Sequence, residues 1–172
     1  MKKNWILSMM AGVLFVFTGL GWAYAREEEN KMDEVSSKMD KESRGPGEAR
    51  RVEERLEKKF NVTDARIDSL RKQGLGYGEI GTTLSLASRM PGGINDQNIQ
   101  KVMDLRQGQG GHKEGWGKIA GQLGMTLKPS VRDMDDVHQA RREDGSEQRR
   151  DQRERPMEAS HGHGHAGPGH HR

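Results

Sequence analysis

The residues of this sequence best suited to chemistry are the histidines of its final segment, HGHGHAGPGHHR. Neutral imidazole binds copper, nickel and zinc well, and a glycine-rich chain can bring several rings to one ion without a preformed cage. Ordering such a chain costs conformational entropy, so the composition favours a metal-buffering segment over a closed structural site. The alternative is a disordered, soluble tail whose histidines bind metal only in vitro. The candidate metal ligands are His161, His163, His165, His170 and His171.

The other chemically interesting side chains do not form a catalytic set. His112 lies in a glycine-rich loop beside Lys113 and Glu114, and His138 is isolated. Exposed carboxylates such as Glu79 and Glu114 could serve an enzyme, but nothing nearby supplies a nucleophile or a third orienting group. We therefore expect no catalytic residues, no bound organic cofactor and no enzymatic activity.

The N-terminal segment MKKNWILSMMAGVLFVFTGLGWAYA has the pattern of an export signal. Lys2 and Lys3 precede an uncharged apolar run that closes on the small residues of Ala23-Tyr24-Ala25. This pattern predicts cleavage after Ala25 and a periplasmic or secreted protein. The run 5–22 is also close to the length that spans a bilayer, so an uncleaved anchor is the alternative. No cysteine stands near the end of the run, which excludes a bacterial lipoprotein anchor.

The composition of the remainder excludes several other classes. Without Lys2 and Lys3, 27 of the 29 basic residues remain against 26 acidic ones, and the two signs are interleaved. A nucleic-acid-binding protein usually shows a basic face, which this pattern lacks. There is no cysteine, so no disulfide supports the fold. Only 31% of the residues are hydrophobic and 32% are charged, which predicts that much of the chain is disordered.

The apolar residues concentrate in one region. Residues 51–128 are predicted to form a helical domain, preceded by a charged, mostly disordered linker over 26–50. A charged segment over 129–160, partly helical or disordered, leads to the tail at 161–172.

Helical periodicity and breakers divide the domain into about five helices, which predicts an all-α fold. The first ends near Asn61, Thr63 caps the second, Pro91-Gly92-Gly93 stops the third, and Asn95 or Asp96 caps the fourth. The expected inward-facing residues are Val52, Leu56 and Phe60; Ile67 and Leu70; Ile80, Leu84 and Ala87; Ile99, Val102, Met103 and Leu105; and Trp116, Ile119, Ala120 and Leu123.

An internal repeat runs through these helices. The segment IDSLRKQGLGYGEIGTTLSL aligns with VMDLRQGQGGHKEGWGKIAGQLGM, so that Leu-Arg, glycines and aromatic-Gly-x-Ile recur, with Tyr77 matched to Trp116. The second copy has four extra loop residues. Two such helix-turn-helix-like units are expected to close a core by packing on one another.

These two segments resemble a family of uncharacterised exported bacterial proteins with repeated Gly-aromatic-Gly-x-Ile units. The resemblance covers about residues 50–130. It implies a small helical domain in a secreted protein and adds no activity and no catalytic residues.

The stretch EGWGKIAGQLGM also resembles the opening of a DNA-binding helix-turn-helix. An exported chain meets no chromosomal operator. The next helix would have to grow through Pro129, with Asp133, Asp135 and Asp136 close behind, and we therefore expect no nucleic-acid partner.

The function expected from the sequence is that of an exported, non-enzymatic helical protein, a binding or structural module of the bacterial envelope. Its expected partner is an unidentified envelope protein or a second copy. The main alternative is an envelope metal-binding protein that buffers copper, nickel or zinc through the histidine tail, and the weaker one is helix-turn-helix DNA binding.

Overall fold

The protein is all-helical, as the sequence predicts. The computed structural model describes residues 20–108 and 112–154, and its side chains over 26–108 and 112–142. No strand occurs in the described ranges, which hold seven helices, two more than expected. They are α1 (Leu20–Glu42), α2 (Glu48–Phe60), α3 (Asp64–Lys72), α4 (Tyr77–Ser88), α5 (Asp96–Gln107), α6 (Trp116–Gln122) and α7 (Lys128–Glu154).

The boundaries of α2 to α6 follow the local signals of the sequence. Helix α2 ends where Asn61 turns into the left-handed conformation, at φ 50°, and its N–H donates to the Glu57 carbonyl. Helix α5 is capped by Asn95, whose side-chain oxygen accepts a hydrogen bond from the Asn98 N–H at 2.9 Å. Thr63 occupies the predicted cap position of α3 with extended backbone, but its side chain makes no capping bond.

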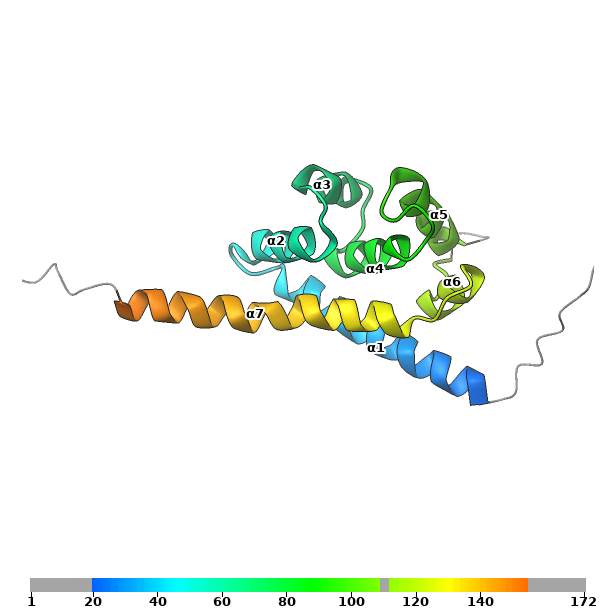
Figure 1. Cartoon of the computed structure of the whole chain (residues 1–172), viewed down its shortest axis with the longest axis horizontal. Helices are drawn as coiled ribbons and strands as arrows, with labels where there is room; N and C mark the ends of the chain where they lie inside the picture. The colour runs from blue at the N-terminus through cyan, green and yellow to red at the C-terminus, as the bar shows by residue number, and fades with distance from the viewer. Residues whose placement is uncertain (1–19, 109–111, 155–172) are drawn as a thin grey trace, which may run out of the picture.

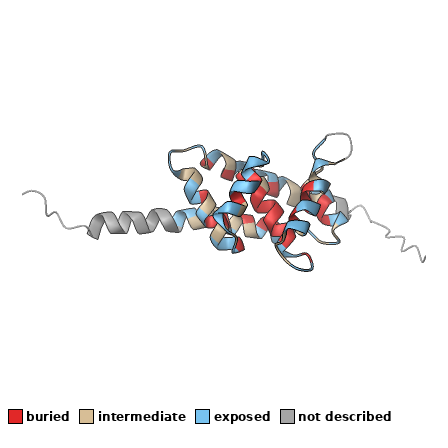
Figure 2. Cartoon of the chain, turned by 90° about the horizontal axis from the view of Figure 1, so that it is seen from above, coloured by how far each residue is buried: buried red, intermediate tan, exposed pale blue. Residues whose placement is uncertain are grey.

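Helix α4 lies at the centre of the molecule, and every residue from Ile80 to Ala87 is buried. Figure 2 shows the buried residues gathered in the middle of the molecule. The small residues of α4 allow neighbouring helices to approach it closely. A methyl group at Gly78 would lie 2.5 Å from the Ser36 Cα, and one at Gly81 would lie 2.6 Å from the Met134 sulfur. The sequence YGEIGTTLSLAS therefore suits a helix surrounded by others.

The expectation of a disordered linker over 26–50 is wrong, because most of this segment forms helix. Met32, Val35 and Met39 stand at i, i+3 and i+7 of α1, and all three are buried in the core. Helix α1 packs against α4, α7, α6 and α2. Apart from the buried Glu42, its charged residues between 26 and 42 are exposed or half-buried, so a low mean hydropathy conceals an apolar stripe.

Residues 128–154 form helix α7. The segment 129–160 was expected to be partly helical or disordered, and the first of these alternatives holds for its described part. Val131, Met134 and Val137 bury one face of α7 against α1, α4 and α2. Figure 1 shows α2 to α6 on one side of α7, with α1 crossing it. The sequence predicts that the two repeat units close the core by packing on one another. They do not do so alone, because α1 and α7 complete the core.

Helix α7 continues past the body of the protein. We call residues 143–154 the arm, which at about 1.5 Å per residue is about 18 Å long. Figure 1 shows this end of α7 extending beyond α2. Among the described helices, none combines the length and apolar character that crossing a bilayer requires.

Candidate functional site

Each repeat unit uses its arginine to hold its aromatic residue. The Arg71 guanidinium lies 4.4 Å from the centre of the Tyr77 ring, and that of Arg106 lies 4.3 Å from the Trp116 ring. Each guanidinium also donates a hydrogen bond to the carbonyl two residues before the aromatic, at Leu75 in one unit and at Glu114 in the other. The repeated Leu-Arg seen in the sequence is therefore a clamp on the turn, a role that the alignment alone did not assign.

The Tyr77 hydroxyl is fixed as well, because it donates a hydrogen bond of 2.5 Å to the Glu53 carboxylate. Burial and this carboxylate raise the pKa of Tyr77 to about 12. The phenol therefore stays neutral at physiological pH and serves packing and hydrogen bonding.

Helix α1 brings a carboxylate to the start of each helix that an aromatic opens. Asp40 accepts a hydrogen bond of 3.0 Å from the Gly78 N–H, and a side chain at Gly76 would lie 2.7 Å from its Oδ2. A side chain at Gly115 would likewise collide with the Glu29 carboxylate. The two acids are three helical turns apart on α1, so Asp40 reaches the first unit and Glu29 reaches the second. Their negative charges interact favourably with the positive N-terminal ends of α4 and α6.

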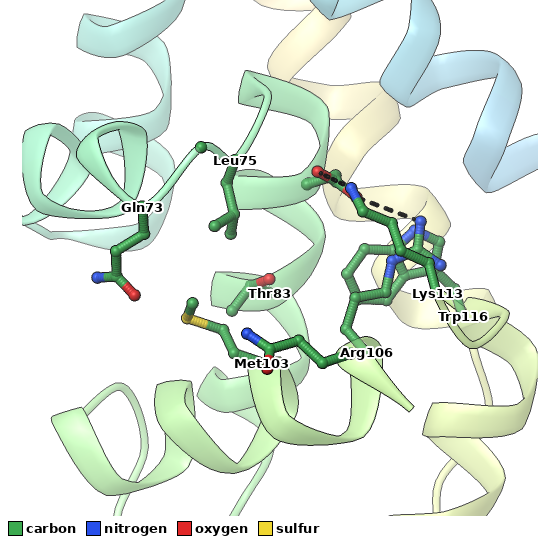
Figure 3. Close-up of a pocket in the computed structure, with 10 residues that line it drawn as sticks. Gln73, Leu75, Thr83, Met103, Arg106, Lys113 and Trp116 are labelled. Carbon is green, nitrogen blue, oxygen red and sulfur yellow. Dashed lines mark hydrogen bonds and ion pairs between the residues drawn. The ribbon is translucent and has the colours of Figure 1, made fainter. Parts of the chain in front are cut away.

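A pocket of about 160 Å³ lies where the two units meet. We call it the seam pocket, and Figure 3 shows the side chains that surround it. Leu75 and Thr83 come from the first unit, and Met103 and Trp116 from the second. The polar and charged lining residues are Gln73, Glu79, Arg106, Gln107 and Lys113.

The charges of the seam pocket are linked. Glu79 accepts hydrogen bonds from Lys113 at 2.7 and 2.9 Å and from Arg106 at 3.3 Å. Burial opposes ionisation of Glu79, but these two cations outweigh it and lower the pKa of the carboxyl group. Glu79 is therefore an ionised partner in a charge network, and the pocket keeps one positive charge in excess.

The two other candidates in this region do not join the pocket. The Glu114 carboxylate pairs with Lys118 at 2.7 Å, and His112 is exposed in the loop before α6. The structure thus brings Glu79 to the pocket while it leaves the Glu114 carboxylate and His112 outside its lining.

A second polar cluster lies between α1, α2 and α7. Glu42 is 1% exposed and accepts a 2.5 Å hydrogen bond from Arg55, which is 5% exposed. The Arg141 Nε lies 3.3 Å from the same carboxylate, and the His138 Nδ1 lies 3.7 Å from its other oxygen. In the sequence alone His138 is isolated, because its contact with Glu42 depends on α7 reaching the end of α1.

The predicted metal ligands, His161, His163, His165, His170 and His171, lie outside the described residues, as do residues 1–19 of the predicted signal. Within the described residues, no three His, Cys, Asp or Glu side chains gather in a way that could hold a metal ion. Comparison with family models, curated proteins and solved structures finds no match to this chain.

Proposed function

We propose that the chain is an exported, non-enzymatic helical module of the bacterial envelope that binds another envelope component through the arm of α7. The observation that carries this proposal is the form of α7. Its first half is held in the core up to Val137, and the helix then continues to Glu154, past the other helices in Figure 1. A helix anchored at one end and extended at the other is a rigid means of presenting residues to a partner.

The chemistry of the seam pocket supports a role without catalysis. Its carboxylate, Glu79, is held ionised by Lys113 and Arg106. A general acid needs a raised pKa, and a general base needs a free lone pair aimed at a substrate. Glu79 instead uses its oxygens to bind two cations, which suits binding and packing.

Site-specific photocrosslinking tests the proposed role of the arm. A photoreactive residue at Gln148 or Gln152, both in the arm, is expected to capture a partner in intact cells. The same residue at the exposed Gln100 of α5 is the matched control and is expected to capture nothing. The absence of a product from both arm positions, together with a monomer on gel filtration, would contradict the proposal. Fractionation of the same cells tests export separately.

Metal buffering by the histidine tail is the second candidate. The position of the tail in the sequence supports this candidate. Its first histidine, His161, follows Glu154, the last residue of the arm, by only seven residues (161 − 154).

Calorimetric titration with copper, nickel or zinc tests this second function. The binding heat of the full chain is expected to vanish in a chain that ends at Ser160 and to persist in a His112→Ala, His138→Ala variant. It should also weaken as the pH falls through about 6.5, where imidazole becomes protonated. An unchanged heat after truncation would rule out the tail as the site.

A further inference from the structure

The seam pocket has the size of a small-molecule site. Its volume is about 160 Å³, and a cavity of about 150 Å³ in another protein holds one benzene molecule. The side chains of Leu75, Met103 and Trp116 give it apolar walls. A compact apolar group, such as a single ring or a branched alkyl chain, would fill this space.

The charge of the pocket selects among ligands with such a group. Arg106 and Lys113 carry two positive charges, and Glu79 offsets one of them. A cationic ligand would be repelled by this excess positive charge, and one face of Trp116 is already covered by Arg106. A neutral ligand would gain nothing from the excess positive charge, whereas an anionic ligand would be attracted by it.

Lys113 is the cation free to receive an anion. Its side chain is 63% exposed, while Arg106 is held by Trp116, by the Glu114 carbonyl and by Glu79. The Lys113 ammonium has three N–H donors and can bind a second carboxylate without leaving Glu79. An arriving carboxylate therefore needs no rearrangement of the buried part of the network.

We propose that the seam pocket binds a small carboxylate with a compact apolar body, the body lying against Trp116, Met103 and Leu75 and the carboxylate pairing with Lys113. This site is independent of the partner-binding role of the arm.

Sodium benzoate is the probe that tests the site. In the full chain with Trp5→Phe and Trp22→Phe, Trp116 is the only one of the three tryptophans left, so its indole N–H resonance reports on the pocket alone. At constant ionic strength, benzoate is expected to shift this resonance saturably, with a dissociation constant of about 1 mM for a ligand of this size. Benzamide is expected to bind more weakly, and benzylamine is expected not to bind.

Two lysine variants assign the charge. Lys113→Gln is expected to weaken benzoate binding about three- to fivefold, the range for a partly exposed ion pair. Lys118→Gln is the matched control, since Lys118 is 58% exposed and pairs with Glu114 outside the pocket lining, and its affinity should be unchanged.

Three results would overturn the proposal. They are the absence of a saturable Trp116 shift, equal affinities for benzoate and benzamide, and equal losses in the Lys113→Gln and Lys118→Gln variants. Folding of each variant is checked in the same spectra, because a folded protein keeps its dispersed amide signals.

Discussion

Gly78 is a residue where the fold leaves almost no room for a side chain. A methyl group there would lie 2.5 Å from the Ser36 Cα, and this neighbour is backbone that cannot rotate away. Gly78→Ala is therefore expected to lower the free energy of unfolding by about 1–3 kcal/mol, as overpacking does elsewhere. Urea denaturation followed by circular dichroism measures the change.

Gly121 provides the matched control, because it is also helical but a methyl group there would have no neighbour within 4 Å. Gly121→Ala should be neutral or stabilise the protein by up to about 1 kcal/mol through helix propensity. Equal stabilities of the two variants would show that α1 and α4 are not in contact at Ser36.

Glu42 is the residue whose charge the core depends on. It is 1% exposed and is the carboxylate paired with Arg55, whose Nε and Nη1 are buried without a hydrogen-bond partner among the described residues. Glu42→Gln leaves the buried guanidinium without its counter-charge and is expected to cost about 3–5 kcal/mol. Thermal and urea unfolding both measure this loss.

The control for Glu42 lies on the same helix. Glu34 is 62% exposed and pairs with Lys38 at 2.6 Å, so Glu34→Gln should cost at most about 1 kcal/mol. A similar small cost for both substitutions would place Glu42 in solvent and contradict the cluster described above.

At the scale of helices, the sequence predicted those whose ends are marked locally. Asn61, Asn95 and the glycines before Tyr77 and Trp116 are stop, cap and turn signals that act within a few residues. It did not predict α1 or the full length of α7. Their apolar residues are few, and burial of Met32 or Met134 depends on α4, which lies far away in the sequence.

In the candidate site too, the sequence predicted the locally marked residues and missed the contacts between distant segments. The alignment of the two repeat units found Tyr77 and Trp116 and their leading arginines, and of these four residues Arg106 and Trp116 line the seam pocket. It could not place Lys113 against Glu79, because this pair joins a loop to a helix of the other unit. The contact between His138 and Glu42 was missed for the same reason. It requires helix in the linker 26–50, expected to be mostly disordered, and in the segment 129–160, expected to be partly helical or disordered.

Helix α7 is tied to its neighbours by a carboxylate whose charge can be titrated. Asp133 accepts a hydrogen bond from the Ser85 hydroxyl at 2.7 Å and pairs with Arg89 at 2.6 Å and Lys59 at 3.2 Å. Burial opposes ionisation, but the hydrogen bonds and charges of these partners outweigh it and lower the pKa of Asp133.

This shift fixes the direction of the pH dependence. A carboxyl group with a lowered pKa in the folded state stabilises the protein fully above its unfolded pKa of about 4, and that contribution is lost as the pH falls through the folded pKa. Asp133→Asn is expected to cost about 1–3 kcal/mol at pH 7. The difference from the parent chain should narrow below about pH 4, as measured by denaturation at several pH values.

Asp136 supplies the control for this experiment. It is 52% exposed and contacts only Lys59 among the three partners of Asp133, so Asp136→Asn should change stability by less than about 1 kcal/mol. A difference between Asp133→Asn and the parent chain that stayed constant as the pH fell well below the unfolded pKa would show that the charge of Asp133 does not stabilise α7.

At the scale of the whole molecule, the core is closed by α1 and α7, the first and last of the described helices. Helices α1 and α7 contact one another, and each also packs on α4. The two repeat units between them supply the inner surface but leave it uncovered on that side (Figure 1). Because Met32, Val35 and Met39 of α1 are buried in this core, the region 51–128 alone should expose a broad apolar area and fail to unfold cooperatively.

Two truncations distinguish a required helix from a dispensable one. A chain that starts at Ser43 lacks α1, including Met32 and Met39, which are both 0% exposed, and is expected to lose cooperative unfolding, since removing even one such side chain costs about 2–5 kcal/mol. A chain that ends at Arg142 lacks the arm but keeps Val131, Met134 and Val137, and should unfold at nearly the parent temperature.

Differential scanning calorimetry separates the outcomes. A cooperative transition in the chain without α1 would show that the two repeat units are sufficient for the core, whereas a large loss of stability on removing the arm would place residues 143–154 in contact with the body.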